Sequence, residues 1–180
     1  MENRNVLSMK KIVSQFTNPV LFIGIAVMLR LIPHLPNMSP IAAMALFGGV
    51  YVNKKYALLV PLLAMAISDM FLGFSWVTPF VYGSFLLIGM IGLWLRGHQS
   101  PLYIVLASLV GSTIFFLITN FGVWVVGGLY PHTLQGLQDC FVLALPFFRN
   151  TILGDLLYVG VLFGSFVFAR TLLKQKVAIV

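Results

Sequence analysis

Charged residues are scarce in this chain of 180 residues, and acidic residues are the scarcest of them. Asp and Glu together number four, and charged residues make up 8% of the chain, against about 25% in soluble domains. Hydrophobic residues make up 60%, and the mean hydropathy is +1.02. A soluble globular domain is therefore excluded, and the composition predicts an integral membrane protein of several apolar helices.

Cysteine is nearly absent, because Cys140 is the only one in the chain. One cysteine cannot form a disulfide within the chain or build a thiolate zinc cluster. The histidines are too dispersed to predict a metal site, so we expect no metal and no cofactor. The net charge of +7 would suit nucleic acid, but no stretch interleaves basic and aromatic residues on a soluble face. We therefore expect no nucleic-acid partner.

Sequence motifs of well-known catalysts are missing too. The chain contains no G-x-S-x-G, no H-E-x-x-H and no G-x-x-x-x-G-K-S/T. Hydrolases, zinc proteases and ATPases would need these residues for their mechanisms. We therefore predict that the chain is not an enzyme and that it does not bind ATP itself.

Six apolar segments follow one another along the chain. A helix needs about 20 residues to cross a bilayer, so the second segment must tilt, extend into its loop or be buried among its neighbours. The sequence predicts an all-α integral membrane protein, a compact bundle of six transmembrane helices. It divides into a cytoplasmic N-terminal segment (1–18), the membrane domain (19–172) and a cytoplasmic basic tail (173–180). The six apolar segments are 20–33, 41–52, 56–71, 77–95, 102–127 and 141–168.

Basic residues gather at every second link between these segments. Cytoplasmic loops of membrane proteins carry an excess of Lys and Arg. With six spans and a cytoplasmic N-terminus, nine of the eleven basic residues fall on the cytoplasmic side, and only Arg30 and Arg149 do not. The pattern predicts that both termini are cytoplasmic. The nine residues are Arg4, Lys10, Lys11, Lys54, Lys55, Arg96, Arg170, Lys174 and Lys176.

Small residues recur four positions apart in three of the segments, which lets helix backbones approach closely. Ala45 and Gly49 form such a pair in the second segment, and Gly160 and Gly164 form one in the sixth. The fifth segment has Ser108 with Ser112, and another pair beside it. We expect these residues to pack the bundle, without predicting a particular dimer.

Four charged residues lie inside or beside apolar segments, where a charge costs a few kcal/mol. Arg30, Asp69, Arg149 and Asp155 all fall towards the outer ends of their predicted spans. They either pair with one another as structural ion pairs or line a pocket open to the exterior, walled by aromatic residues such as Tyr82. The candidate substrate-binding residues are these four together with His34, Asn37, Asn120, Trp124, His132 and Asn150.

Four stretches of the chain resemble an uncharacterised family of bacterial six-span membrane proteins. They are RLIPHLPNMSPIAAMALFGGVY (30–51), AISD (66–69), TNFGVW (119–124) and LPFFRNTILGD (145–155). That family is in turn similar in size, topology and segment pattern to the S-components of energy-coupling-factor (ECF) vitamin transporters, the cobalamin-type members among them. The first resemblance covers about residues 20–168.

The second resemblance implies a function. An S-component is a small receptor in the bacterial cytoplasmic (inner) membrane that captures a vitamin or related micronutrient from the outer side. Its partners would be the solute, membrane lipid, a transmembrane T-component and ATPase subunits on other chains. The sequence leaves two alternatives open, a scaffold subunit of a membrane complex and a channel for ions or small solutes. A channel should have polar residues along its whole path, whereas the inner halves of these segments have almost none.

Overall fold

The computed structural model describes residues 18–33 and 35–178, and within them all the regular structure is helical. The expected all-α class is thus confirmed for this part of the chain. The helices are α2 (Pro19–Leu31), α3 (Ile41–Tyr51), α4 (Lys54–Ala57), α5 (Leu59–Leu72), α6 (Thr78–Leu95), α7 (Pro101–Val126), α8 (Leu134–Leu143) and α9 (Leu145–Ala178).

Four stretches of helix are long and apolar enough to cross a membrane, which indicates a membrane protein. They are Lys54–Leu72, made of α4 and α5, then α6, α7 and the Leu145–Leu172 part of α9. The helices α2 and α3 are also apolar but have only 13 and 11 residues. At a rise of about 1.5 Å per residue neither reaches across a hydrocarbon core of about 30 Å.

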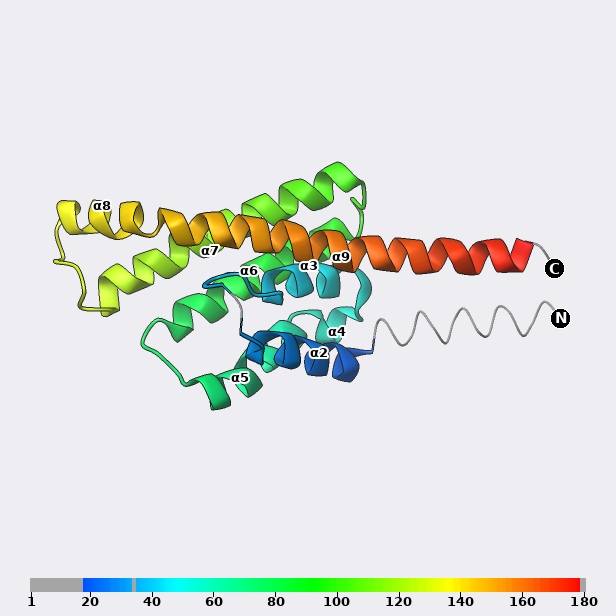
Figure 1. Ribbon diagram of the computed structural model, residues 1–180, viewed down its shortest axis with the longest axis horizontal. Coiled ribbons are helices and arrows are strands. Elements are labelled where there is room, and N and C mark those ends of the chain that lie inside the picture. Colours follow the sequence, from blue (N-terminus) through cyan, green and yellow to red (C-terminus); the bar gives the residue numbers. More distant parts are fainter. Residues whose placement is uncertain (1–17, 34, 179–180) are drawn as a thin grey trace.

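The helices run back and forth along the long axis of the molecule, with α4 and α5 together forming one passage and α8 and α9 another (Figure 1). The links 52–53 and 96–100 lie towards the end at which α9 finishes, and α2 begins towards that same end. We call it the basic end, because Lys54, Lys55 and Arg96 lie at these links. The links 32–40, 73–77 and 127–133 lie towards the opposite end, which we call the polar end.

Helix α3 forms the centre of the bundle. Every residue from 41 to 50 is buried, as expected for a helix with no polar face, and the helix is only three turns long. The Phe47 ring lies 5.4 Å from the ring of Phe22 on α2 and 5.3 Å from that of Phe163 on α9. Of the three possibilities for this short segment, burial among its neighbours is therefore the one that the structure shows.

The backbones of α3 and α6 touch where two glycines meet. A Cβ atom added to Gly49 would lie 2.4 Å from the Gly92 carbonyl carbon, and one added to Gly92 would lie 2.7 Å from the Leu46 carbonyl oxygen. No side chain fits at these distances, so only glycine allows the two helices to pack this closely. Of the two residues in the predicted Ala45–Gly49 pair, Gly49 thus forms the expected close contact.

Arg96 ties the end of α6 to the end of α3. Its Nε donates a hydrogen bond to the Gly49 carbonyl oxygen at 2.6 Å, and a terminal nitrogen donates to the Val52 carbonyl oxygen. The last carbonyl groups of a helix have no partner within it, and a cation at this end also suits the helix dipole. Arg96, predicted only as a cytoplasmic charge, therefore also closes the C-terminus of the central helix.

Three expectations for the C-terminal part of the chain were wrong. The predicted span 141–168 is not one helix, because α8 ends at Leu143 and α9 begins at Leu145. Pro146 has no N–H to donate to a preceding carbonyl, so it begins a new helix instead of continuing α8. Residues 134–139, expected in a loop, belong to α8. Gly160 and Gly164 are exposed and border a cavity between α7 and α9, with nothing within 4 Å of an added Cβ, so they make no close helix contact of the expected kind.

The glycine contact predicts a position-dependent effect of one methyl group. Gly92→Ala would drive a Cβ into the α3 backbone, and we expect it to destabilise the protein by about 1–3 kcal/mol, as overpacking usually does. Gly160→Ala is the matched control, because it adds the same atom to a helix at an open position. Thermal unfolding in detergent measures both. Equal stability of the two variants would contradict the contact.

Candidate functional site

Arg30 and Asp69 form an ion pair between α2 and α5. A terminal nitrogen of Arg30 lies 2.6 Å from Asp69 Oδ1. Asp69 is buried, with 4% of its surface exposed. Since an isolated charge in this environment is strongly unfavourable, each residue neutralises the other. Ion pairing, one of the two alternatives left open for the four charged residues, is therefore what the structure shows for Arg30 and Asp69.

Two further side chains complete this pair. Tyr82 on α6 donates from its hydroxyl to Asp69 Oδ2 at 2.7 Å. Arg30 also donates to Ser68 Oγ and, at 3.4 Å, to the Met65 carbonyl oxygen. The Ser68 hydroxyl is left to donate to the α5 backbone, 2.7 Å from the Ala64 carbonyl oxygen. The network joins α2, α5 and α6 and satisfies its buried groups, as a stable polar network requires.

A second buried carboxylate lies between α9 and α7. Asp155 has 3% of its surface exposed, and its Oδ2 lies 2.6 Å from Ser112 Oγ. Ser112 Oγ is also 3.0 Å from the carbonyl oxygen of Ser108, one turn earlier on α7. Asp155 makes no ion pair with any residue that the structure describes. Of the two alternatives, ion pairing therefore does not apply to Asp155 among the described residues, and Arg149 is exposed on α9.

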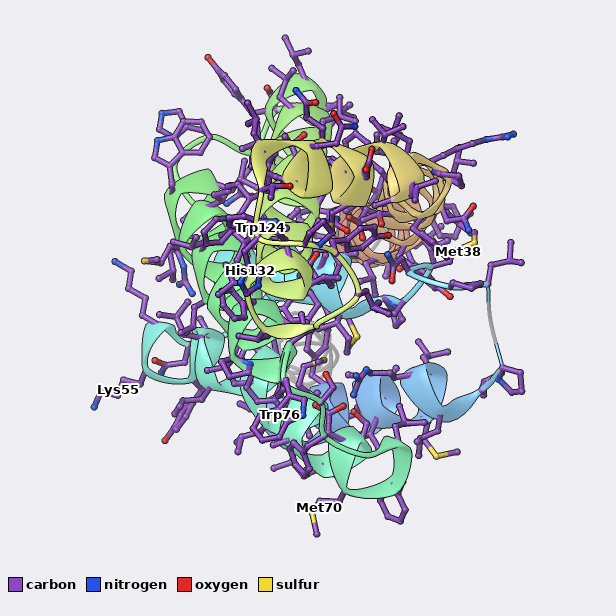
Figure 2. The ribbon with its side chains drawn as sticks, turned by 90° about the vertical axis from the view of Figure 1, so that its left-hand side faces the viewer. Met38, Lys55, Met70, Trp76, Trp124 and His132 are labelled. Carbon is purple, nitrogen blue, oxygen red and sulfur yellow. The ribbon has the colours of Figure 1, made fainter. Side chains whose placement is uncertain are left out.

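Aromatic and polar side chains meet where α7 turns into α8, at the polar end (Figure 2). Trp124 donates from its ring nitrogen to the Pro131 carbonyl oxygen at 3.0 Å, and its ring lies 5.5 Å from that of His132. This hydrogen bond holds the Trp124 ring against the link 127–133 and holds that link against α7. Figure 2 shows Trp76, on the α5–α6 link, at the same end.

Asn120 and Cys140 join α7 to α8 behind this turn. The Cys140 thiol donates to the Asn120 carbonyl oxygen at 3.4 Å, and the Asn120 amide donates to the Phe116 carbonyl oxygen at 2.7 Å. Burial raises the pKa of the Cys140 thiol, which keeps it protonated at neutral pH. Cys140 is therefore an inert packing residue, and the Asn120 amide is engaged with its own helix.

The link between α2 and α3 contacts the start of α9. Asn150 donates from its amide to the Pro36 carbonyl oxygen at 3.2 Å. Asn37 has a φ of 62°, in the left-handed region that asparagine tolerates better than most residues. Arg149, next to Asn150, is exposed and makes no hydrogen bond or ion pair with the described residues. An unpaired cation therefore lies beside this contact.

Of the ten candidate residues, those that the structure describes lie in three places. Arg30 and Asp69 lie in the α2–α5–α6 network, and Asp155 lies at the α7–α9 interface. Six belong to the polar end or its links, and His34 lies outside the described residues. Two cavities in the described part of the chain have other linings: an apolar one of about 300 Å³ between α2, α3 and α9, and one of about 430 Å³ between α7 and α9. The binding role of the ten residues stays a prediction.

Two residues of these networks were not predicted as site residues. The Ser68 hydroxyl contacts Arg30, the partner of buried Asp69, and the Ser112 hydroxyl contacts buried Asp155 itself. The sequence contains a signal for Ser68, because it directly precedes Asp69. The signal for Ser112 is weaker. Its spacing from Ser108 predicts only helix packing, and Ser112 and Asp155 are 43 residues apart in the sequence, so no local pattern indicates their contact.

The fold and these networks define a helical membrane protein with buried polar groups, and the comparisons assign it to a family. The chain belongs to DUF6580, a family of unknown function, whose model matches residues 10–177. No curated protein and no solved structure matches the chain.

The ion pair predicts non-additive mutations. Arg30→Met leaves Asp69 buried without its cation, and we expect a loss of about 3–5 kcal/mol in the free energy of unfolding. Asp69→Leu should cost a similar amount, because it leaves Arg30 unpaired. The double variant should cost less than the sum, since it buries neither charge. Unfolding of the four proteins in the same detergent tests this, and strict additivity would contradict the pair.

Proposed function

We propose that the chain crosses the bacterial cytoplasmic membrane six times, with both termini in the cytoplasm. The alternation of the helices supports this, because consecutive links lie at opposite ends of the molecule. The short helices α2 and α3 would complete their crossings with the links that flank them. The basic end would face the cytoplasm, as the positive-inside rule requires, and the polar end would face outwards.

We further propose that the protein is a solute-binding protein of the S-component type, which captures a vitamin or related micronutrient from the outer side. The observation that carries this proposal is that Arg149, at the polar end, is exposed and has no partner among the described residues. An exposed guanidinium offers a fork of donors that suits a carboxylate or phosphate group on a solute. Asn150 holds the start of α9 against the link 32–40 and so fixes the place of Arg149.

Other groups at the polar end suit the same role. Trp124 and His132 form an aromatic pair on the α7–α8 link, and such surfaces bind the apolar parts of ligands while a few polar groups orient them. The chain lacks an ATP-binding motif, so uptake would need a T-component and ATPase subunits on other chains. A solute between these segments would contact residues from the three links at this end.

One observation favours a different function, a scaffold subunit of a membrane complex. The network of Arg30, Asp69, Ser68 and Tyr82 leaves none of its buried side-chain atoms without a partner, as expected for groups that only hold helices together. A scaffold would keep its stability and its partner proteins without binding any solute. The two functions therefore differ in what purifies with the protein.

Native mass spectrometry of the protein from its own membranes distinguishes these functions. We expect a vitamin-sized adduct near one-to-one occupancy that is released on denaturation. Arg149→Ala should lose most of this adduct without losing stability, because Arg149 has no partner among the described residues. Arg170→Ala, which removes an exposed cation at the basic end, is the matched control and should keep the adduct.

Two results would count against the proposal. A folded protein that is reproducibly empty would contradict solute binding, and co-purified protein subunits without a small molecule would support the scaffold. An adduct that survives Arg149→Ala but is lost in Arg170→Ala would place the binding site at the wrong end of the bundle.

A further inference from the structure

The two buried carboxylates of the bundle have different surroundings. Asp69 and Asp155 are equally buried, with 4% and 3% of their surface exposed. Asp69 contacts the Arg30 guanidinium and the Tyr82 hydroxyl, whereas Asp155 contacts a single hydroxyl, that of Ser112. An ionised carboxylate in an apolar interior is strongly unfavourable unless a cation or several donors compensate it. Asp69 has this compensation among the described residues, and Asp155 does not.

Among the described residues, the elements packed against α9 offer Asp155 no cation; the link 32–40 also lies against α9, with Met38 close to Gly154, and its His34 lies outside the described residues. Helices α3 and α7 contain no Lys, Arg or His, and α8 contains none either. On α9, Arg149 is exposed, and Arg170 borders a cavity at the basic end beside Tyr51 and Gln99. The side chains of Lys174 and Lys176 lie outside the described part, four or more turns from Asp155. The other titratable groups on these four helices are Tyr51, Tyr103, Asp139, Cys140 and Tyr158.

The Ser112 hydroxyl has a single hydrogen but lies within hydrogen-bond distance of two acceptors. Ser112 Oγ lies 2.6 Å from Asp155 Oδ2 and 3.0 Å from the Ser108 carbonyl oxygen. A serine hydroxyl has one hydrogen to donate, so it can donate to only one of these two acceptors. Both contacts are hydrogen bonds only if Asp155 carries a proton and donates it to Ser112, while Ser112 donates to the carbonyl.

We propose that Asp155 is a proton-binding site inside the bundle. Its O–H donates to Ser112 Oγ, and the Ser112 O–H donates to the Ser108 carbonyl oxygen. On release, the Asp155 O–H bond breaks, its electron pair stays on the carboxylate and the proton goes to water. The Ser112 hydroxyl then rotates from the carbonyl to Asp155 Oδ2, so that no other group changes its proton.

A second buried group supports this assignment. The Ser108 hydroxyl oxygen is fully enclosed and has no hydrogen-bond partner in the described part of the chain. It lies on the same face of α7 as Ser112, one turn away, where residues four apart are neighbours. The α7–α9 interface therefore contains more polar groups than its apolar packing requires. The proton site stands apart from the proposed solute, which no step of this argument uses.

Infrared difference spectroscopy of the whole protein in an ester-free detergent tests the proposal at neutral pH. Wild type minus Asp155→Asn should show the C=O stretching band of a protonated carboxylic acid, and the band should move to lower frequency in D2O. Ser112→Ala should shift it to higher frequency, because the acid loses its hydrogen-bond acceptor. Wild type minus Asp139→Asn, which removes an exposed carboxylate on α8, should lack the band. A difference spectrum with only carboxylate bands at Asp155 would overturn the proposal.

The same substitution at the two buried carboxylates gives a second test. An amide mimics a protonated acid in shape and can donate to Ser112, so Asp155→Asn should leave the Tm in detergent nearly unchanged. Asp69→Asn removes the counter-charge of Arg30 and should lower the Tm by many degrees. Equal losses in the two variants would show that Asp155 is needed as an ion and would overturn the proton site. Neither measurement requires a solute, so an empty protein in mass spectrometry would leave this proposal standing.

Discussion

Contact between the backbones of α3 and α6 at Gly49 and Gly92 determines how the rest of the bundle can pack. Because no Cβ separates the two helices, α3 lies deep enough for α2, α5, α7 and α9 to pack around it. With only 11 residues, α3 is too short to span the bundle, so its central position depends on contacts with its neighbours. It is held by glycine contact on one side, by the rings around Phe47 on another, and by Arg96 at its C-terminal end.

The scarcity of charge makes each buried ionisable group informative. In an apolar interior a carboxylate is either paired with a cation or protonated, and the bundle contains one candidate for each state. Asp69 joins three helices through Arg30 and Tyr82, which is a structural task. Among the described residues Asp155 has only a hydroxyl partner, at the α7–α9 interface, which suits the proton that we propose it binds. The groups proposed to bind a solute are the exposed ones at the polar end, and Arg149 is foremost among them.

Composition and hydropathy were sufficient to predict a helical membrane protein, and the ends of most segments agree with the helices within a few residues. Ion pairing among the charges of the apolar segments was one of two alternatives, and the sequence could not show that Arg30 pairs with Asp69 while Arg149 does not pair with Asp155. The Asp155–Ser112 contact was not, because it joins residues 43 positions apart and serine is common in such helices. The exposure of Gly160 and Gly164 was equally unpredictable, because their spacing shows that α9 has a face of small residues but not whether another helix packs closely against that face.

The account depends on the polar end facing outwards and the basic end facing the cytoplasm. Cysteine accessibility in intact cells tests this most directly, in a Cys140→Ser background. Trp76→Cys lies on the exposed α5–α6 link at the polar end, and Gly97→Cys lies at the basic end, where an added side chain meets nothing. A membrane-impermeant maleimide should label Trp76→Cys in intact cells and Gly97→Cys only after permeabilisation. Labelling of both from outside, or the reverse order, would contradict the account.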